Sequence, residues 1–145
     1  MLIHEGLELL PRDQCIGYLQ RGGVGRVGLT MHGLPMILPV NFVFLDGDVV
    51  FRTGEGTKLH AAADNTVVAF EIDAYDEQSE SGWSVLVIGH SSTVTDQAEL
   101  ARLAGGHLRA WPDGTRASYV RVRPELVSGR RLPESTPGGT PSPAS

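Results

Sequence analysis

Short apolar runs alternate along the chain with turns rich in glycine and aspartate, which is typical of a protein built from antiparallel β-strands. The first runs cover residues 24–31, 34–45 and 49–53, and the turns between them cover 32–33 and 46–48. Consecutive strands joined by such turns pair as neighbours. The first half of the chain therefore predicts meander hairpins.

The second half predicts three further strands, over residues 66–73, residues 83–95 and from Tyr119 to about Val127. The middle of the run 83–95 is apolar at every position, so we expect both of its faces to be covered. Pro124 is expected at a bulge or an edge. Short helices are predicted near residues 9–19, 59–63 and 96–103, and a polar loop over 76–82. Roughly six strands with short helices between them predict a mainly β fold, a small antiparallel barrel with peripheral helices.

The length of 145 residues suits one domain, which we place at residues 1–132. Residues 133–145 are rich in proline, glycine and serine and are predicted to be a disordered tail. The net charge of −5 argues against a general nucleic-acid binder. Cys15 is the single cysteine, so neither an intramolecular disulfide nor a thiolate metal cluster is expected. With no secretory signal and no apolar run long enough to span a bilayer, a cytoplasmic protein is expected.

Lys58 is the only lysine, and it ends the segment 51–58, where a strand breaks into a glycine loop before a short helix. Arg52, Thr53, Thr57 and Lys58 together offer charged and hydroxyl donors to one anion, and a phosphate group is the obvious candidate. The alternative is that the loop glycines are ordinary turn residues and that Lys58 is merely solvated. Glu55 would repel a phosphate unless its carboxylate points away.

The chain offers few groups for acid–base or nucleophilic catalysis. The five histidines have no metal-binding spacing, so no metal site is predicted, and Ser84 lacks the second glycine of a hydrolase nucleophile motif. Redox chemistry stays open, because a bound flavin carries the reaction and the protein needs only to hold and tune it. Pro39 and Asn41 lie in an apolar strand, where free backbone groups and the Asn41 amide could meet a polar heterocycle; the alternative is an edge strand with Asn41 facing solvent.

Three segments, 39–41, 51–58 and 82–89, resemble the pyridoxamine 5'-phosphate oxidase-like family of split β-barrel flavoproteins in their order and spacing. The resemblance runs from about Leu10 to Leu132 and is strongest to the short members of actinobacterial type. It implies a six-stranded antiparallel split β-barrel with short peripheral helices. It also implies an FMN site that is shared between the two subunits of a homodimer.

The same resemblance implies roles for individual residues. The positions that hold the phosphate match Arg52, Thr57 and Lys58, with Thr53 beside them. The strand that lies against the isoalloxazine ring matches Val40 and Asn41. Ser84 stands where fuller oxidases commonly place a glutamine near the ring, with Trp83 and Val85 flanking it. The chain departs from those oxidases by having one residue fewer between the threonine and Lys58, and by lacking an Arg-Leu-His-type segment for pyridoxal phosphate, so oxidation of vitamin B6 is not expected.

The resulting prediction is an FMN-dependent oxidoreductase that acts on an unidentified small organic substrate. No catalytic residue is assigned. The deazaflavin F420 is the alternative cofactor, and two other functions remain open. One is a flavin or F420 carrier or sensor without turnover, and the other is a heme-handling protein with His60 or His90 as axial ligand.

Overall fold

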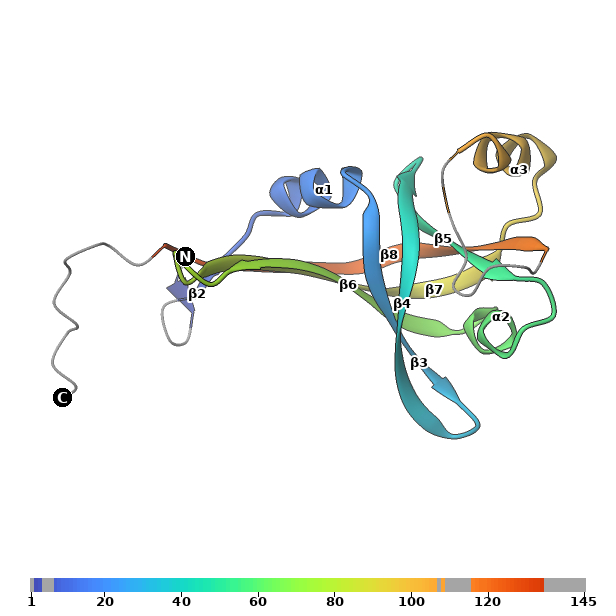
Figure 1. Cartoon of the computed structure of the whole chain (residues 1–145), viewed down its shortest axis with the longest axis horizontal. Helices are drawn as coiled ribbons and strands as arrows, with labels where there is room; N and C mark the ends of the chain where they lie inside the picture. Colours follow the sequence, from blue (N-terminus) through green and yellow to red (C-terminus); the bar gives the residue numbers. More distant parts are fainter. Residues whose placement is uncertain (1, 4–6, 107, 109–115, 135–145) are drawn as a thin grey trace, which may run out of the picture.

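The computed structural model describes residues 2–3, 7–106, 108 and 116–134. The strands are β1 (Leu2–Ile3), β2 (Leu7–Leu9), β3 (Gly23–Met31), β4 (Leu34–Leu45), β5 (Asp48–Gly54), β6 (Val67–Asp76), β7 (Ser81–Thr93) and β8 (Ala117–Leu132). The helices are α1 (Arg12–Gln20), α2 (Lys58–Ala63) and α3 (Gln97–Ala104). β7 and β8 run along the long axis of the molecule, and the β3–β4 hairpin projects away from them (Figure 1).

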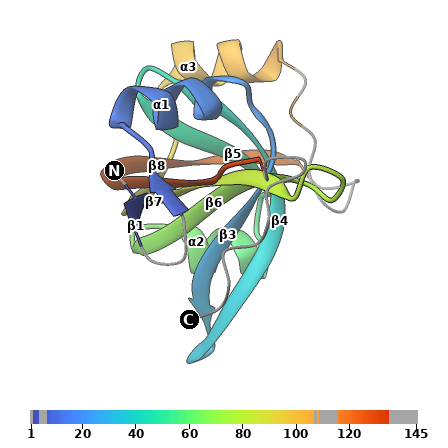
Figure 2. The ribbon, with the colours of Figure 1, turned by 90° about the vertical axis from the view of Figure 1, so that its left-hand side faces the viewer.

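All strands belong to one antiparallel sheet in the order β1-β2-β8-β5-β4-β3-β6-β7, and β7 also pairs with β8. This last pairing closes the strands β3 to β8 into a ring, seen from its end in Figure 2. The closure is uneven, because the β7–β8 ladder is long whereas β3 and β6 pair only from Arg26↔Glu71 to Gly28↔Ala69. The predicted mainly β barrel with short peripheral helices is confirmed.

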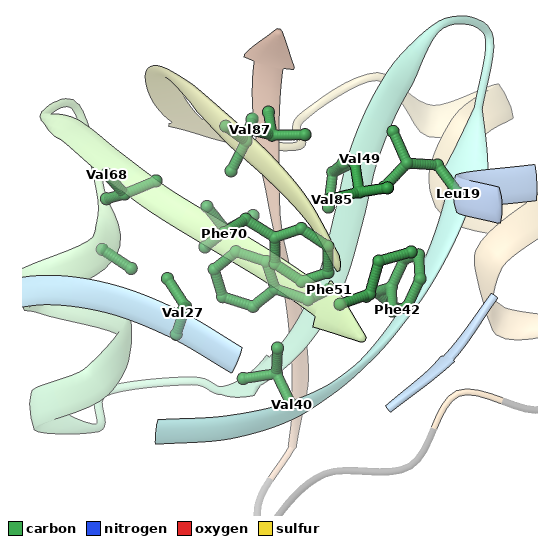
Figure 3. Close-up of a cluster of buried hydrophobic side chains, with 14 of the residues drawn as sticks. Leu19, Val27, Val40, Phe42, Val49, Phe51, Val68, Phe70, Val85 and Val87 are labelled. Atoms are coloured by element: carbon green, nitrogen blue, oxygen red, sulfur yellow. The ribbon is translucent and has the colours of Figure 1, made fainter. Parts of the chain in front are cut away.

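The barrel interior is filled by side chains that alternate along each strand, as a half-buried strand requires. In β6, Val68, Phe70 and Ile72 are buried while Glu71 between them is half-buried. The Phe70 ring packs edge-on against Phe42, with the ring centroids 4.8 Å apart (Figure 3). The core is thus assembled from aromatic and branched residues of several strands.

Helices α1 and α3 cover the same side of the barrel (Figures 1 and 2). Helix α1 buries Cys15 and Leu19 against the main core. Helix α3 buries Leu103 over a second, smaller apolar cluster on the outside of β5 and β8. The carboxylate of Asp96 accepts a hydrogen bond from the Glu99 amide at 3.0 Å, so the predicted helix start at Asp96 is confirmed.

Several predicted boundaries were wrong. The polar loop expected over residues 76–82 is much shorter, because β6 and β7 stay paired down to Asp76↔Ser81. The last strand continues beyond Val127 to Leu132, and the N-terminal strands β1 and β2 were not predicted. The end of β8 pairs with β7 and β2, and β2 pairs with β8, so these two segments are held by strands distant in sequence rather than by an apolar pattern of their own. The predicted tail lies outside the described residues from position 135 onward.

The β7–β8 ladder confirms one prediction about Pro124 and contradicts another about the faces of β7. Pro124 pairs with Gly89 beside the register shift at Ile88/Gly89, which confirms the predicted bulge. The β7 run, however, is covered on its inner face only: Val85 and Val87 are buried, whereas Leu86 and Ile88 are half-buried. Within one copy of the described chain, the outer face of this apolar strand therefore has no full cover.

Candidate functional site

The loop between β5 and α2 is closed by the side chain of Thr57. Its hydroxyl donates to the Gly54 carbonyl at 2.7 Å and accepts from the His60 amide at 3.1 Å, so Thr57 caps the N-terminus of α2. Gly56 has φ = +74°, a conformation that favours glycine, which explains the glycine before Thr57. The loop geometry therefore follows from local sequence. The Thr57 hydroxyl is already engaged in building the loop.

Arg52 and Lys58 bring two cations to this loop. Arg52 is half-buried on β5 and donates one terminal N–H to the Leu108 carbonyl at 3.1 Å. Its Nε is buried and finds no hydrogen-bond partner among the described residues. Lys58 is exposed at the first position of α2. Glu55, the acid that could have opposed an anion here, lies 3.5 Å from Arg116 and is thus partly neutralised.

Thr53 belongs to a hydrogen-bond relay that sequence reasoning did not detect. Its hydroxyl lies 2.8 Å from Nδ1 of His60, and Nε2 of His60 lies 3.1 Å from the Thr93 hydroxyl. Thr93 in turn donates to the Asp64 carboxylate at 2.8 Å. Because Thr93 gives its proton to Asp64, it accepts from His60, which assigns the Nε2–H tautomer and makes Thr53 the donor to Nδ1. Thr93 is 33 positions from His60 in sequence, so no local pattern marked this contact.

This relay bears on the heme alternative. Both ring nitrogens of His60 are engaged, so His60 would have to break a hydrogen bond before it could serve as an axial ligand. His90 is exposed on β7. No group of three or more metal-ligating side chains occurs within the described part of the chain.

The β4 candidates lie beside this loop. Phe42 pairs with Phe51, so Asn41 and Arg52 are the next residues along two neighbouring strands and share the outer face. Asn41 is half-buried and has a polar partner, whereas Val40 is buried in the core with 2% of its surface exposed. We call Arg52, Thr53, Thr57 and Lys58 with Asn41 the cationic junction.

The β7 candidates form a separate site. The Trp83 ring stacks on Tyr18 of α1, with centroids 3.8 Å apart, and Arg21 lies 4.8 Å from the centre of the Tyr18 ring. Trp83 and Ser84 line a cavity of about 400 Å³, whereas Val85 is fully buried. We call it the Trp83 cavity; its lining comprises Leu7, Asp73, Ala74, Tyr75, Gly82, Trp83, Ser84, Arg130 and Leu132.

The structure does not bring the two groups of candidates together within one chain. Arg52 pairs with Tyr119 near the start of β8, whereas Ser84 pairs with Arg130 near its end. Positions 119 and 130 are eleven residues apart, which is about 36 Å along an extended strand. Strand β8 runs along the long axis of the molecule (Figure 1), so the two groups of candidates lie at different points along that axis.

Three charged side chains pair with one another on the outer face of the barrel, and one of them, Asp73, lines the Trp83 cavity. Arg26 of β3 lies 2.8 Å from both Glu71 and Asp73 of β6. Burial raises the pKa of Glu71, and a hydrogen bond shared with Asp73 raises it further. The hydrogen bond to Glu71 raises the pKa of Arg26. Arg26 pairs with both carboxylates on the sheet face, so neither is an isolated reactive acid.

The geometry defines a small antiparallel barrel with a cationic junction at one end and an aromatic cavity at the other. The sequence matches the pyridoxamine 5'-phosphate oxidase family over residues 11–131, and the chain belongs to that family. Within the described residues, no helix has the length and apolar character required to cross a membrane.

Three relatives illustrate the similarity. The Mycobacterium tuberculosis protein Rv0080 is 35% identical over 128 residues, which cover 85% of this chain and 84% of that protein. The FAD binding protein from Mycobacterium smegmatis is 40% identical, with a TM-score of 0.71 over 86% of this chain and 96% of that one. A Corynebacterium glutamicum structure assigned provisionally as a pyridoxamine 5'-phosphate oxidase is 28% identical, with a TM-score of 0.75 over 92% of this chain and 98% of that one.

Proposed function

We propose that this protein binds a flavin, FMN in the first instance, between two copies of the chain and acts as an oxidoreductase on a small organic substrate. The bound flavin would supply the electron or hydride transfer, and the chain would supply binding and orientation. We place the protein in the cytoplasm, because a single buried cysteine suits a reducing compartment.

The observation that carries the proposal is the buried Nε–H of Arg52, which has no hydrogen-bond partner among the described residues. A buried N–H without an acceptor is unfavourable, and a phosphate oxygen would supply the acceptor together with a charge-assisted bond. Lys58, the first residue of α2, adds a second cation at the other end of the loop. Because the hydroxyls of Thr53 and Thr57 are engaged by His60 and Gly54, the cationic groups are the donors that remain for the phosphate.

Two features support a site shared between subunits. A flavin mononucleotide, a three-ring system with a five-carbon chain, is much shorter than the separation along β8 between Arg52 and the Trp83 cavity, so one molecule cannot touch both in one chain. The outer face of the barrel also exposes apolar side chains, including Ile37 at 75%, Val67 at 61% and Leu126 at 48%. A second copy packed on this face would cover them and could place its own Trp83 cavity beside the first copy's cationic junction.

The cofactor choice rests on the same chemistry. The M. smegmatis relative is described as an FAD binding protein, and FMN, FAD and F420 all carry a phosphate that the cationic junction could hold. The mass of the cofactor released from purified protein identifies which of them is bound.

Lys58→Ala tests the site. We expect the affinity for FMN to fall by about 1.5–3 kcal/mol, the usual contribution of a charge-assisted hydrogen bond. Arg12→Ala, which removes an exposed cation from α1, is the matched control and should leave the affinity unchanged. Flavin fluorescence titration measures both. Equal FMN affinity in wild type and Lys58→Ala would show that the phosphate does not bind at this junction.

A flavin carrier or sensor without turnover is the second candidate. One observation favours it: Asp73, the carboxylate that lines the Trp83 cavity in the described structure, is already paired with Arg26, so it is poorly placed to act as an acid or base. The two functions differ in one measurement. An oxidoreductase should pass electrons from the reduced bound flavin to an acceptor faster than free flavin does, and a carrier should not.

A further inference from the structure

The floor of the Trp83 cavity consists of two rows of residues across β6, β7 and β8. Asp73 pairs with Ser84, and Ser84 pairs with Arg130, which makes a polar row. Two positions further along, Tyr75 pairs with Gly82, and Gly82 pairs with Leu132, which makes an apolar row on the same outer face. A ligand with a polar group at one end and a flat apolar part at the other would contact both rows.

Gly82 keeps the apolar row open. A Cβ atom at this position would lie 2.5 Å from the Ala74 carbonyl oxygen and 3.1 Å from Cδ2 of Tyr75. The Tyr75 ring therefore leans over the glycine while remaining 62% exposed. The cavity volume of about 400 Å³ is within the range of small-molecule sites.

The charges around the cavity are not equally available to a ligand. Asp73 reaches toward β3, where it pairs with Arg26. Arg131 follows Arg130 but points to the opposite face of β8, where it pairs with Glu8. Arg130 has no ion pair among the described residues, so its guanidinium is the cation that the cavity offers to a ligand.

We propose that the Trp83 cavity binds a small organic anion, a carboxylate on a flat apolar body, through Arg130. This inference deepens the proposed function, because it names the substrate class of the same enzyme. The carboxylate meets Arg130, and the apolar part of the ligand lies between Tyr75 and Leu132. The flavin phosphate does not account for this cation, because in the shared site Arg52 and Lys58 of the other copy already supply the cations for the phosphate.

Benzoate and its neutral counterpart benzamide are the probes, measured by calorimetric titration of the full-length protein with and without FMN. We expect benzoate to bind wild type, and Arg130→Gln to bind it about tenfold more weakly, as loss of one charge-assisted contact predicts. Benzamide should bind wild type and Arg130→Gln alike. Arg130→Lys, which keeps the charge, should retain most of the benzoate affinity and separates loss of charge from misfolding. Arg123→Gln is the matched control on the same strand and should behave as wild type.

Several results would overturn the assignment. These are no benzoate binding to wild type, equal affinity for benzoate and benzamide, or an Arg130→Gln variant that binds benzoate as well as wild type does. A fall in FMN affinity in Arg130→Gln would also overturn it, because Arg130 would then hold the cofactor. Failure of the proposed function looks different: wild type would not bind FMN, while the dependence of benzoate binding on Arg130 would remain.

Discussion

Replacing Gly25 with alanine is expected to destabilise the barrel, because the new methyl group would collide with the core. A Cβ atom at Gly25 would lie 2.4 Å from Cζ and 2.6 Å from Cε2 of Phe70. Non-bonded carbon atoms prefer separations of about 3.5–4.0 Å, so the ring would have to move by more than about 1 Å. Phe70 is fully buried and packed against Phe42, which leaves it little room.

The magnitude follows from two opposing terms. Overpacking a core costs about 1–3 kcal/mol. Replacing glycine by alanine also restricts the unfolded chain, which offsets about 0.4–1 kcal/mol. We therefore expect Gly25→Ala to lower the free energy of unfolding by about 1–2 kcal/mol. Gly17→Ala in α1, where nothing lies within 4 Å of the new Cβ, is the control and should stabilise the protein by about 0.5–1 kcal/mol.

Urea unfolding at one fixed protein concentration measures these effects, with the midpoint expected to change and the slope to stay constant. A double mutant tests the mechanism. Phe70→Leu removes the two ring atoms closest to the new Cβ and leaves the Glu71 carbonyl oxygen at 3.1 Å, so the loss in Gly25→Ala/Phe70→Leu should be smaller than the sum of the single losses by about 1 kcal/mol. Additive losses, or a Gly25→Ala variant as stable as Gly17→Ala, would refute the assigned contact.

Two further predictions concern an acid and the shared site. Burial raises the pKa of Asp48 above its ordinary 3.8, despite Arg121 at 2.9 Å. The folded state therefore binds this proton more tightly than the unfolded state does. The free energy of unfolding of wild type relative to Asp48→Asn should fall as the pH rises from 3.8 through the higher folded pKa. Urea unfolding at a series of pH values measures this fall, and an NMR titration of the carboxyl measures the folded pKa. The opposite slope would mean that Arg121 outweighs burial. For the shared site, Ser84→Trp should block the Trp83 cavity of one copy, and Arg52→Ala/Lys58→Ala should remove the cationic junction of the other. Mixing and refolding the two variants should restore about a quarter of the flavin sites through random pairing. If flavin titration finds no restored sites, the site lies within one chain.

Much of the fold could be predicted because strand signals are local. The alternation of apolar and polar residues, together with turns such as 32–33 and 46–48, specifies each hairpin between neighbours in the chain. The cation pair Arg52 and Lys58 could be found for the same reason, since six positions and one tight loop join them. Asp96 as the start of α3 was also readable, because its hydrogen-bond partner is only three residues away.

What the sequence determined by itself was the strands β3 to β8, the turns at 32–33 and 46–48, and the presence of two cations on either side of one loop, because those features depend on residues a few positions apart. The tertiary structure alone decided that the Thr53 hydroxyl is taken by His60, that Trp83 stacks on Tyr18, and that the β7 candidates lie far along β8 from Arg52. These contacts depend on strand register and ring closure, which are set by packing between segments distant in sequence.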